Sequence, residues 1–263
     1  MSVNTSRRSS LNAMVPEGMV VSRKWLLNNN VNRHGIDNLV KTGQLESVAT
    51  GVFKKPDSPI TWEGLVSSLQ QYFSLDLVVG GLTALELQGL GHYVPMSAQN
   101  IIHVYVKEPL PKWVNNLSWV SFIQHRSKFL LKRNSKKDLE PEYDDQTFTQ
   151  NWSNGKFTLY MSIPEKAILE ALDGVPETIS FEHAGQLMQA MTAVSPKKME
   201  ELLVLSKSLK AKRLFFWFAE HQNYPWLAKI DRSNILLGVG KRVVAKGGKI
   251  DKKYLITVPR EYE

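Results

Sequence analysis

The sequence contains no cysteine, and this absence excludes several kinds of site. A chain without thiols forms no disulfide scaffold, no cysteine nucleophile, no cysteine-based zinc site and no cysteine-ligated iron–sulfur cluster. The six histidines show neither the H-E-x-x-H spacing nor a cluster. His92 and His103 are therefore interpreted as structural histidines rather than ligands. We expect no metal and no cofactor.

Long hydrophobic runs are also missing. The longest stretch without Asp, Glu, Lys or Arg extends from Leu87 to Val106, and it is interrupted by Gln88, Pro95 and Gln99. A membrane-spanning helix needs about 20 mostly apolar residues. The first 18 residues contain no apolar segment like that of a secretory signal. We therefore expect a cytoplasmic protein with no membrane contact.

The chain has 263 residues, of which 43% are hydrophobic and 22% are charged. At about 150 residues per domain, this length corresponds to one or two globular domains. The net charge of +8 is unevenly distributed. Residues 1–60 carry +4, residues 61–194 carry −4 and residues 195–263 carry +8. Two basic ends suit a polyanion such as nucleic acid, although surface lysines also serve solubility alone.

The most informative segment lies between residues 20 and 55. Ser22 is a good N-cap for a short helix, and the Asn28–Asn30 run predicts a tight turn, because Asn side chains compete for backbone hydrogen bonds. A second helix is predicted from Arg33 to Thr42, with Asn32 as its cap and Gly43 as its C′ residue. A small hairpin should follow, with its turn at residues 49–51.

Two short helices, a tight turn and a two-stranded wing predict a winged helix-turn-helix. In this motif the second helix enters the major groove of DNA, and its N-terminal residues lie nearest the bases. Asn can pair with adenine and Arg with guanine, whereas cations and hydroxyls suit phosphates. The alternative is a protein-interaction domain with a solvated polar face. The predicted DNA-binding residues are Ser22, Arg23, Lys24, Asn32, Arg33, His34, Asn38, Lys41, Thr50, Lys54 and Lys55.

The rest of the chain predicts a larger mixed α/β domain. Helices are expected over 62–73, 165–172, 181–193, 197–207 and 214–221. Strands are expected at the start of 76–93, over 101–106, 120–124 and 157–162, and in the tail from Ile235 to Val258, with a turn at Gly247-Gly248. The fold class is therefore α/β (α+β), with a winged helix over residues 1–58 and an α/β domain over 59–263. A further division near Ser195 is left open, because the composition turns basic there.

A Gly-Gly turn offers the best enzymatic hypothesis. Gly80 and Gly81 lie between a strand and a helix, as in nucleotidyltransferases, where such glycines bring backbone close to a triphosphate. These enzymes also need paired carboxylates on the next strand to hold Mg²⁺. The strand from Ile101 to Val106 has none. Close packing at the turn is therefore preferred, with a nucleotidyltransferase-like or phosphoryl-transfer enzyme as the alternative.

Five segments, in order along the chain, resemble the AbiEi antitoxins of bacterial type IV toxin–antitoxin systems. They are GIDNLVKTGQLESVATGVF from Gly35, VVGGLTALELQGLGHYVP from Val78, LPKWV from Leu110, IPEKAILEAL from Ile163 and LLGVGKRVVAKGGKIDKKYLITVP from Leu236.

The resemblance implies a non-enzymatic autoregulator in the bacterial cytoplasm. Its winged helix would bind inverted repeats in its own promoter. Because one recognition helix reads only a few base pairs, two copies should occupy such a repeat on double-stranded DNA. The larger domain would counter a nucleotidyltransferase-like toxin without a stable complex. By position in the motif, the DNA-contacting role is carried over to Ser22, Arg23, Asn32, Arg33, His34, Asn38, Lys41, Lys54 and Lys55. The basic runs Lys197–Arg213 and Lys241–Lys253 are candidates for the antitoxic activity on charge alone. A pure protein-binding module that blocks the toxin directly is the remaining hypothesis.

Overall fold

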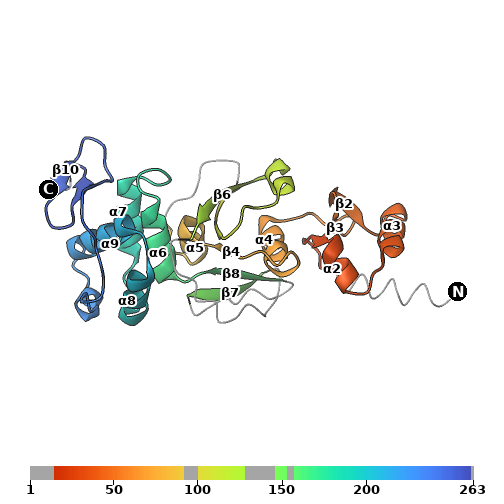
Figure 1. Cartoon of the computed structure of the whole chain (residues 1–263), viewed down its shortest axis with the longest axis horizontal. Coiled ribbons are helices and arrows are strands. Elements are labelled where there is room, and N and C mark those ends of the chain that lie inside the picture. Colours follow the sequence, from red (N-terminus) through yellow and green to blue (C-terminus); the bar gives the residue numbers. More distant parts are fainter. Residues whose placement is uncertain (1–14, 92–99, 128–145, 153–156, 262–263) are drawn as a thin grey trace.

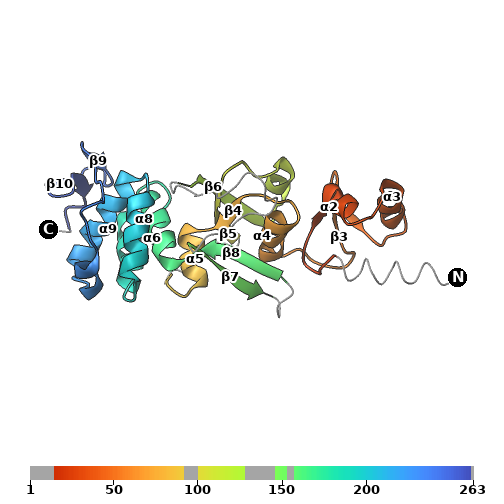
Figure 2. The same cartoon turned by 60° about the horizontal axis from the view of Figure 1, so that its bottom comes forward.

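The structure, a computed structural model, describes residues 15–91, 100–127, 146–152 and 157–261. Figure 1 shows an elongated arrangement of three layers. A small helix-and-wing unit occupies one end, a five-stranded sheet lies in the middle, and a group of helices with a small terminal sheet forms the other end. Figure 2 shows the same order from a second direction.

The N-terminal unit has the predicted helix, turn, helix and wing. Its elements are β1 (Val21–Ser22), α2 (Arg23–Asn28), α3 (Arg33–Lys41), β2 (Glu46–Ala49) and β3 (Val52–Lys54). The three strands pair antiparallel in the order β1-β3-β2, so the wing gains a strand that the sequence pattern did not predict. Leu26, Ile36, Leu45 and Phe53 form a small core beneath the two helices.

The central sheet is mixed and has the order β6-β5-β4-β8-β7. Its strands are β4 (Leu77–Val79), β5 (Asn100–Val106), β6 (Val120–Arg126), β7 (Thr147–Trp152) and β8 (Phe157–Ser162). β5 runs parallel to β6 and β4 runs parallel to β8, while the β4–β5 and β7–β8 pairs are antiparallel. β7 was missed in the sequence analysis, although its Thr, Phe and Trp residues favour a strand.

Helix α4 (Trp62–Gln71) lies between the sheet and the winged helix. Its Leu65 and Leu69 share a core with Val79 and Val104 of the sheet. Val20 and Val52 of the winged helix belong to the same core. The N-terminal unit is therefore packed against the next helix.

The far end is mainly helical. Its elements are α5 (Gly81–Leu87), α6 (Pro164–Asp173), α7 (Phe181–Ala190), α8 (Pro196–Leu205), α9 (Leu209–His221) and η2 (Pro225–Lys229), with α5 adjoining the sheet. The short helix η1 (Lys112–Asn116) instead packs in the core that α4 shares with the sheet. One hydrophobic cluster runs from Ala84 on α5 to Val258 near the end of the chain, and it includes residues on both sides of Ser195. Within the described residues, no helix is both long and apolar enough to cross a bilayer.

The chain ends in a three-stranded sheet formed by β9 (Arg242–Val243), β10 (Lys249–Asp251) and β11 (Ile256–Val258). β11 lies in the centre, antiparallel to β10 and parallel to β9. Strands in this tail were predicted, as was the turn at Gly247-Gly248, where Gly247 has a φ of +71°. Helix α9 begins at Leu209, five residues before the predicted start, because Ser208 caps it through the N–H of Ala211.

Candidate nucleic-acid interface

The turn between α2 and α3 is built by local hydrogen bonds. The Ser22 hydroxyl accepts the N–H of Trp25 at 3.0 Å and so caps α2, as predicted. After Asn28 the chain turns through Asn30, whose φ is +64°, a conformation that Asn tolerates better than most residues. The N–H of Val31 then donates to the carbonyl of Leu26 at 3.0 Å. This bond ties the entrance of α3 to the end of α2.

Helix α3 presents two different faces. The Asn32 side chain accepts the N–H of Gly35 at 2.7 Å and caps the helix, as predicted. Ile36 is fully buried, and Leu39 and Val40 pack against the same core. Gly43, with a φ of +67°, ends the helix in the left-handed conformation that glycine adopts without strain.

The outer face of α3 is polar and exposed. It consists of Arg33, His34, Asp37, Asn38 and Lys41, which are spaced three and four residues apart and so form one continuous stripe. The first turn contains no acidic residue. Guanidinium, imidazole and amide groups near a helix N-terminus are suited to base edges in the major groove.

Asp37 lies within this stripe and was missed in the sequence analysis. Its carboxylate is 3.1 Å from the guanidinium of Arg23, and the two side chains are 63% and 39% exposed. The guanidinium also lies 5.5 Å from the centre of the Phe53 ring. Exposed ion pairs contribute little free energy, so a phosphate can replace Asp37 as the partner of Arg23. The i, i+4 spacing from Arg33 through Asp37 to Lys41 is the sequence pattern that could have placed Asp37 in this stripe.

The wing meets the start of α2. The N–H of Arg23 donates to the carbonyl of Gly51 at 2.7 Å. Thr50 is exposed at the tip of the wing, Lys24 is exposed on the first turn of α2, and Lys55 is half-buried after β3. Thr50 therefore adjoins the start of α2, where Arg23 in turn pairs with Asp37 on α3.

Lys54 has a different environment from the one expected. Its ammonium group is 2.7 Å from Glu46 and donates to the carbonyl of Ser58 at 3.3 Å. Only 15% of the side chain is exposed. Lys54 therefore joins β3 to β2 and to the following segment instead of pointing into solvent towards a phosphate. Glu46 lies directly opposite Lys54 in the hairpin of β2 and β3, and this position explains the ion pair.

Two other predicted contacts are occupied by structural hydrogen bonds. The Ser22 hydroxyl caps α2 and also donates to the carbonyl of Tyr72 at 3.3 Å. The Asn32 carbonyl oxygen caps α3, which leaves its amide nitrogen as the group available to DNA. Bidentate pairing of Asn32 with adenine would require both atoms. Asn38, nearly two turns further along α3, accordingly suits that pairing better.

The winged helix is attached to α4 by polar and aromatic contacts. The N–H of Val20 donates to the Ser68 hydroxyl at 2.9 Å, and this bond is buried. The rings of Trp25 and Tyr72 lie 4.7 Å apart. Gly64 is required at its position, because a Cβ atom there would lie 2.1 Å from the carbonyl oxygen of Gly18. These contacts fix the orientation of α2 relative to the rest of the chain.

The Gly80-Gly81 turn is filled by protein groups. The N–H of Gly81 donates to the Glu170 carboxylate at 2.9 Å, within the buried interior. A Cβ atom on Gly80 would lie 2.4 Å from that carboxylate and 2.5 Å from the Tyr105 ring. Glu170 and Tyr105 therefore occupy the space beside the turn in which the enzymatic hypothesis would place a phosphate. This geometry favours the close-packing interpretation.

Several titratable side chains surround this turn. Burial raises the pKa of Glu170 to about 7, although Lys166 and the bond from Gly81 act in the opposite direction. Burial also raises the pKa of Tyr105. His103 Nδ1 lies 3.1 Å from His125 Nε2. Burial, and to a smaller extent the charge of His125, lowers the pKa of His103 to about 4. His103 is thus a buried histidine with a hydrogen-bond partner, as predicted, whereas His92 lies outside the described residues.

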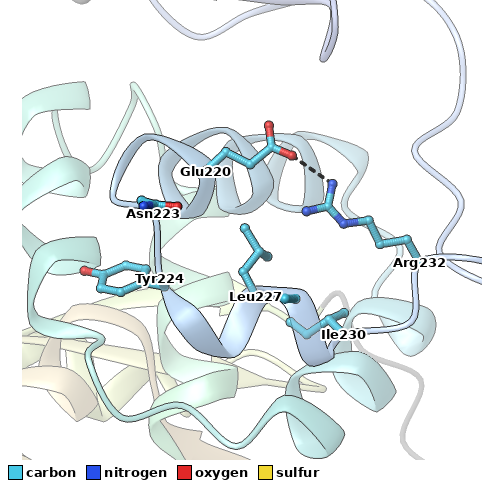
Figure 3. A pocket seen from close by; sticks show the side chains of 7 residues that line it. Glu220, Asn223, Tyr224, Leu227, Ile230 and Arg232 are labelled. Carbon is cyan, nitrogen blue, oxygen red and sulfur yellow. Dashed lines mark hydrogen bonds and ion pairs between the residues drawn. The ribbon is translucent and has the colours of Figure 1, made fainter.

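A hollow of about 360 Å³ lies between the end of α9 and η2 (Figure 3). Leu227 lines it, and at its edge the Glu220 carboxylate lies 2.9 Å from Arg232 and 2.7 Å from Lys253. Burial alone would raise the pKa of Glu220, but hydrogen bonds from Lys253, Tyr254 and Arg232 lower it. These charges are already paired with one another. Within the described residues, no three His, Asp or Glu side chains are placed to hold a metal ion.

Comparison with known proteins identifies two matching family models. One is described as the transcriptional regulator, AbiEi antitoxin N-terminal domain, and matches residues 4–96. The other, for the transcriptional regulator, AbiEi antitoxin, type IV TA system, matches residues 98–259. The RV2827C protein from Mycobacterium tuberculosis has a similar fold, with a TM-score of 0.51 and 15% identity over 90% of this chain and 85% of that chain. No curated protein matches the chain.

Proposed function

Because the chain belongs to the AbiEi antitoxin family of transcriptional regulators in type IV toxin–antitoxin systems, we propose that it represses its own operon. In this proposal the winged helix binds inverted repeats in the promoter. The remainder of the chain counters a nucleotidyltransferase-like toxin encoded beside it, in the bacterial cytoplasm. We also propose that the winged-helix domain ends at residue 58. The two family models divide the chain at a different place, between residues 96 and 98.

The observation that carries the DNA-binding proposal is the exposed stripe on α3. Arg33 and His34 lie in the first turn of α3, Asn38 lies on the same face about one and a half turns beyond Arg33, and all three residues are exposed. In a helix-turn-helix this end of the recognition helix lies nearest the bases. Arg33 is assigned to a guanine and Asn38 to an adenine. Lys24, Lys41, Thr50 and Lys55 are assigned to phosphates, and Arg23 joins them when DNA displaces Asp37.

Two copies are proposed to occupy each operator. A single recognition helix reads only a few base pairs, and a two-fold related pair of chains would match an inverted repeat. The half-sites would then be separated by roughly 10 base pairs, or a multiple of that, between their centres. The copies need not pair before they reach DNA.

A promoter–reporter strain tests the proposal. The upstream region of the operon drives the reporter, and the chain is supplied from a second promoter, with or without the toxin. Wild-type protein should lower reporter output and restore growth in the presence of the toxin. An Arg33→Ala/Asn38→Ala variant should lose repression while still restoring growth, because the stripe on α3 is assigned to DNA alone. Repression by this variant at the wild-type level would contradict the assignment of α3.

A further inference from the structure

The segment from Leu236 to Val243, here called the aliphatic loop, exposes an unusual amount of apolar surface. Leu236 is 75% exposed, Val239 is 86% exposed and Val243 is 64% exposed. These are the three most exposed large hydrophobic side chains within the part of the chain that the structure describes. Single exposed hydrophobic residues are ordinary, but three within eight residues indicate a contact surface.

The backbone of the aliphatic loop is held by two buried cations of α9. Arg213, 1% exposed, donates through Nε to the carbonyl of Leu237 at 2.8 Å and through Nη1 to that of Gly240 at 2.5 Å. Lys212, 3% exposed, donates to the carbonyl of Leu236 at 3.3 Å. Burying cations is costly unless hydrogen bonds compensate, and here the compensation comes largely from the loop itself.

Two glycines also fix the conformation of the aliphatic loop. Gly238 and Gly240 have φ angles of +65° and +80°, which side-chain-bearing residues rarely adopt. A Cβ atom on Gly238 would also lie 2.4 Å from the Leu209 side chain. The loop is therefore fixed in a conformation that leaves Leu236, Val239 and Val243 in solvent, while Leu237 packs against the core. A preformed surface loses little conformational entropy when a partner binds.

The surrounding charge selects the kind of partner. Lys241, Lys246 and Lys252 are exposed around the loop, and residues 195–263 carry 15 basic and 7 acidic side chains. A second copy of this surface would bring like charges together. Nucleic acid is also a poor match for the apolar part, because unpaired bases stack on aromatic side chains and positions 236–243 contain none. A protein with an apolar pocket bordered by carboxylates fits both features.

The position of the surface leaves α3 free. Figures 1 and 2 both place the small terminal sheet, which contains β9 and Val243, at the opposite end of the molecule from α3. A partner at the aliphatic loop would therefore not compete with DNA for space at the recognition helix.

We infer that the aliphatic loop is the docking site for a folded protein that presents an apolar pocket bordered by carboxylates. The identity of that protein rests on the proposed function, in which the partner is the toxin. A surface of three aliphatic side chains with flanking lysines is small, so the contact is transient rather than a stable complex.

The experiment uses the full-length chain and the purified toxin. A photo-reactive residue replaces Val239 in one preparation and Val204 in another, since Val204 on α8 is also exposed, at 45%. Affinity for the toxin is then measured for wild type, for a Leu236→Ser/Val239→Ser variant and for a Val204→Ser control. Operator affinity and the unfolding temperature are measured for each variant.

The inference predicts crosslinking to the toxin from position 239 and none from position 204. The double variant should bind the toxin at least about tenfold more weakly, because two aliphatic side chains lose their burial. Operator affinity should stay within about twofold, and growth rescue should fall only in the double variant.

Three results would overturn the inference: unchanged toxin affinity of the double variant, crosslinks from position 239 only to a second copy, or loop-dependent binding to anionic lipid vesicles without toxin binding. The proposed function fails separately, if wild-type protein neither restores growth nor shifts the operator. Rescue by wild type without toxin contact at position 239 would remove the docking site and leave the proposed function intact.

Discussion

Arg33 is the residue on which sequence selectivity should depend most. It is the first residue of α3, and its side chain is exposed. We expect Arg33→Ala to weaken operator binding by about 1–3 kcal/mol and to relax the base preference at one position. Arg260→Ala, an exposed arginine at the other end of the chain, serves as the control. Equal weakening of Arg33→Ala on every duplex would show that Arg33 contacts phosphate instead of a base.

The two adjacent wing lysines should behave differently. Lys55→Ala should weaken binding to all duplexes alike and reduce the slope of log affinity against log salt by about one. Lys54→Ala should change that slope much less, because Glu46 and Ser58 already hold the ammonium group. Titrations at several salt concentrations distinguish the two variants. Equal slope changes would mean that Lys54 leaves Glu46 for DNA.

Glu170 should make stability depend on pH. Its pKa is raised to about 7 from a usual value of 4.5, so the folded state keeps a proton that the unfolded chain releases between these values. The stability contribution is therefore full below pH 4.5 and is lost as pH rises through 7. Relative to Glu170→Gln, the wild type should lose roughly 3 kcal/mol of unfolding free energy across this window. Urea unfolding at a series of pH values measures it, and a constant difference would contradict the prediction.

At this scale, local hydrogen bonding could be predicted and longer-range pairing could not. The caps at Ser22 and Asn32 depend on residues three positions away, so the sequence pattern was sufficient. The partner of Lys54 lies across a hairpin, and that of Arg23 lies 14 residues away on another helix. The structure was therefore needed to show which lysine and arginine side chains are unpaired and can contact phosphates.

Among the elements, α9 has the clearest dual role. It forms much of the far core and also supplies the cations that hold the aliphatic loop. Arg213→Met keeps similar bulk but removes donors from the carbonyls of Leu237 and Gly240. We expect a loss of about 2–4 kcal/mol in unfolding free energy and faster amide exchange over residues 237–243. Unchanged exchange in that segment would show that the loop is held by other contacts.

The α9 segment also shows why its start was mispredicted. The sequence Lys210-Ala211-Lys212-Arg213 has the polarity of a solvated connection. Lys212 and Arg213 are nevertheless buried, because they donate to carbonyls of a segment more than 20 residues later. The charge-based candidacy of these two residues for antitoxic activity is accordingly replaced by a structural role. Winged-helix elements were easier to predict, because their caps, turns and apolar spacing are all local.

For the whole molecule, the winged helix and the basic C-terminal region lie at opposite ends (Figure 1). The sequence indicated the two basic regions but not their separation, which depends on the stacking of α4, the sheet and the helical layer. The order β6-β5-β4-β8-β7 likewise depends on pairings between strands far apart in the chain. The proposed DNA-binding face and the proposed docking site therefore lie at opposite ends.

The central claim is sequence-selective operator binding by the exposed stripe of α3. A gel-shift titration of the full chain against its own upstream region tests it most directly, with a scrambled duplex of equal length as control and two salt concentrations. We predict two successive shifts on the operator, weaker binding to the scrambled duplex, and preserved selectivity at the higher salt concentration. Equal and strongly salt-dependent binding to both duplexes would contradict the account and reduce the winged helix to a general basic surface.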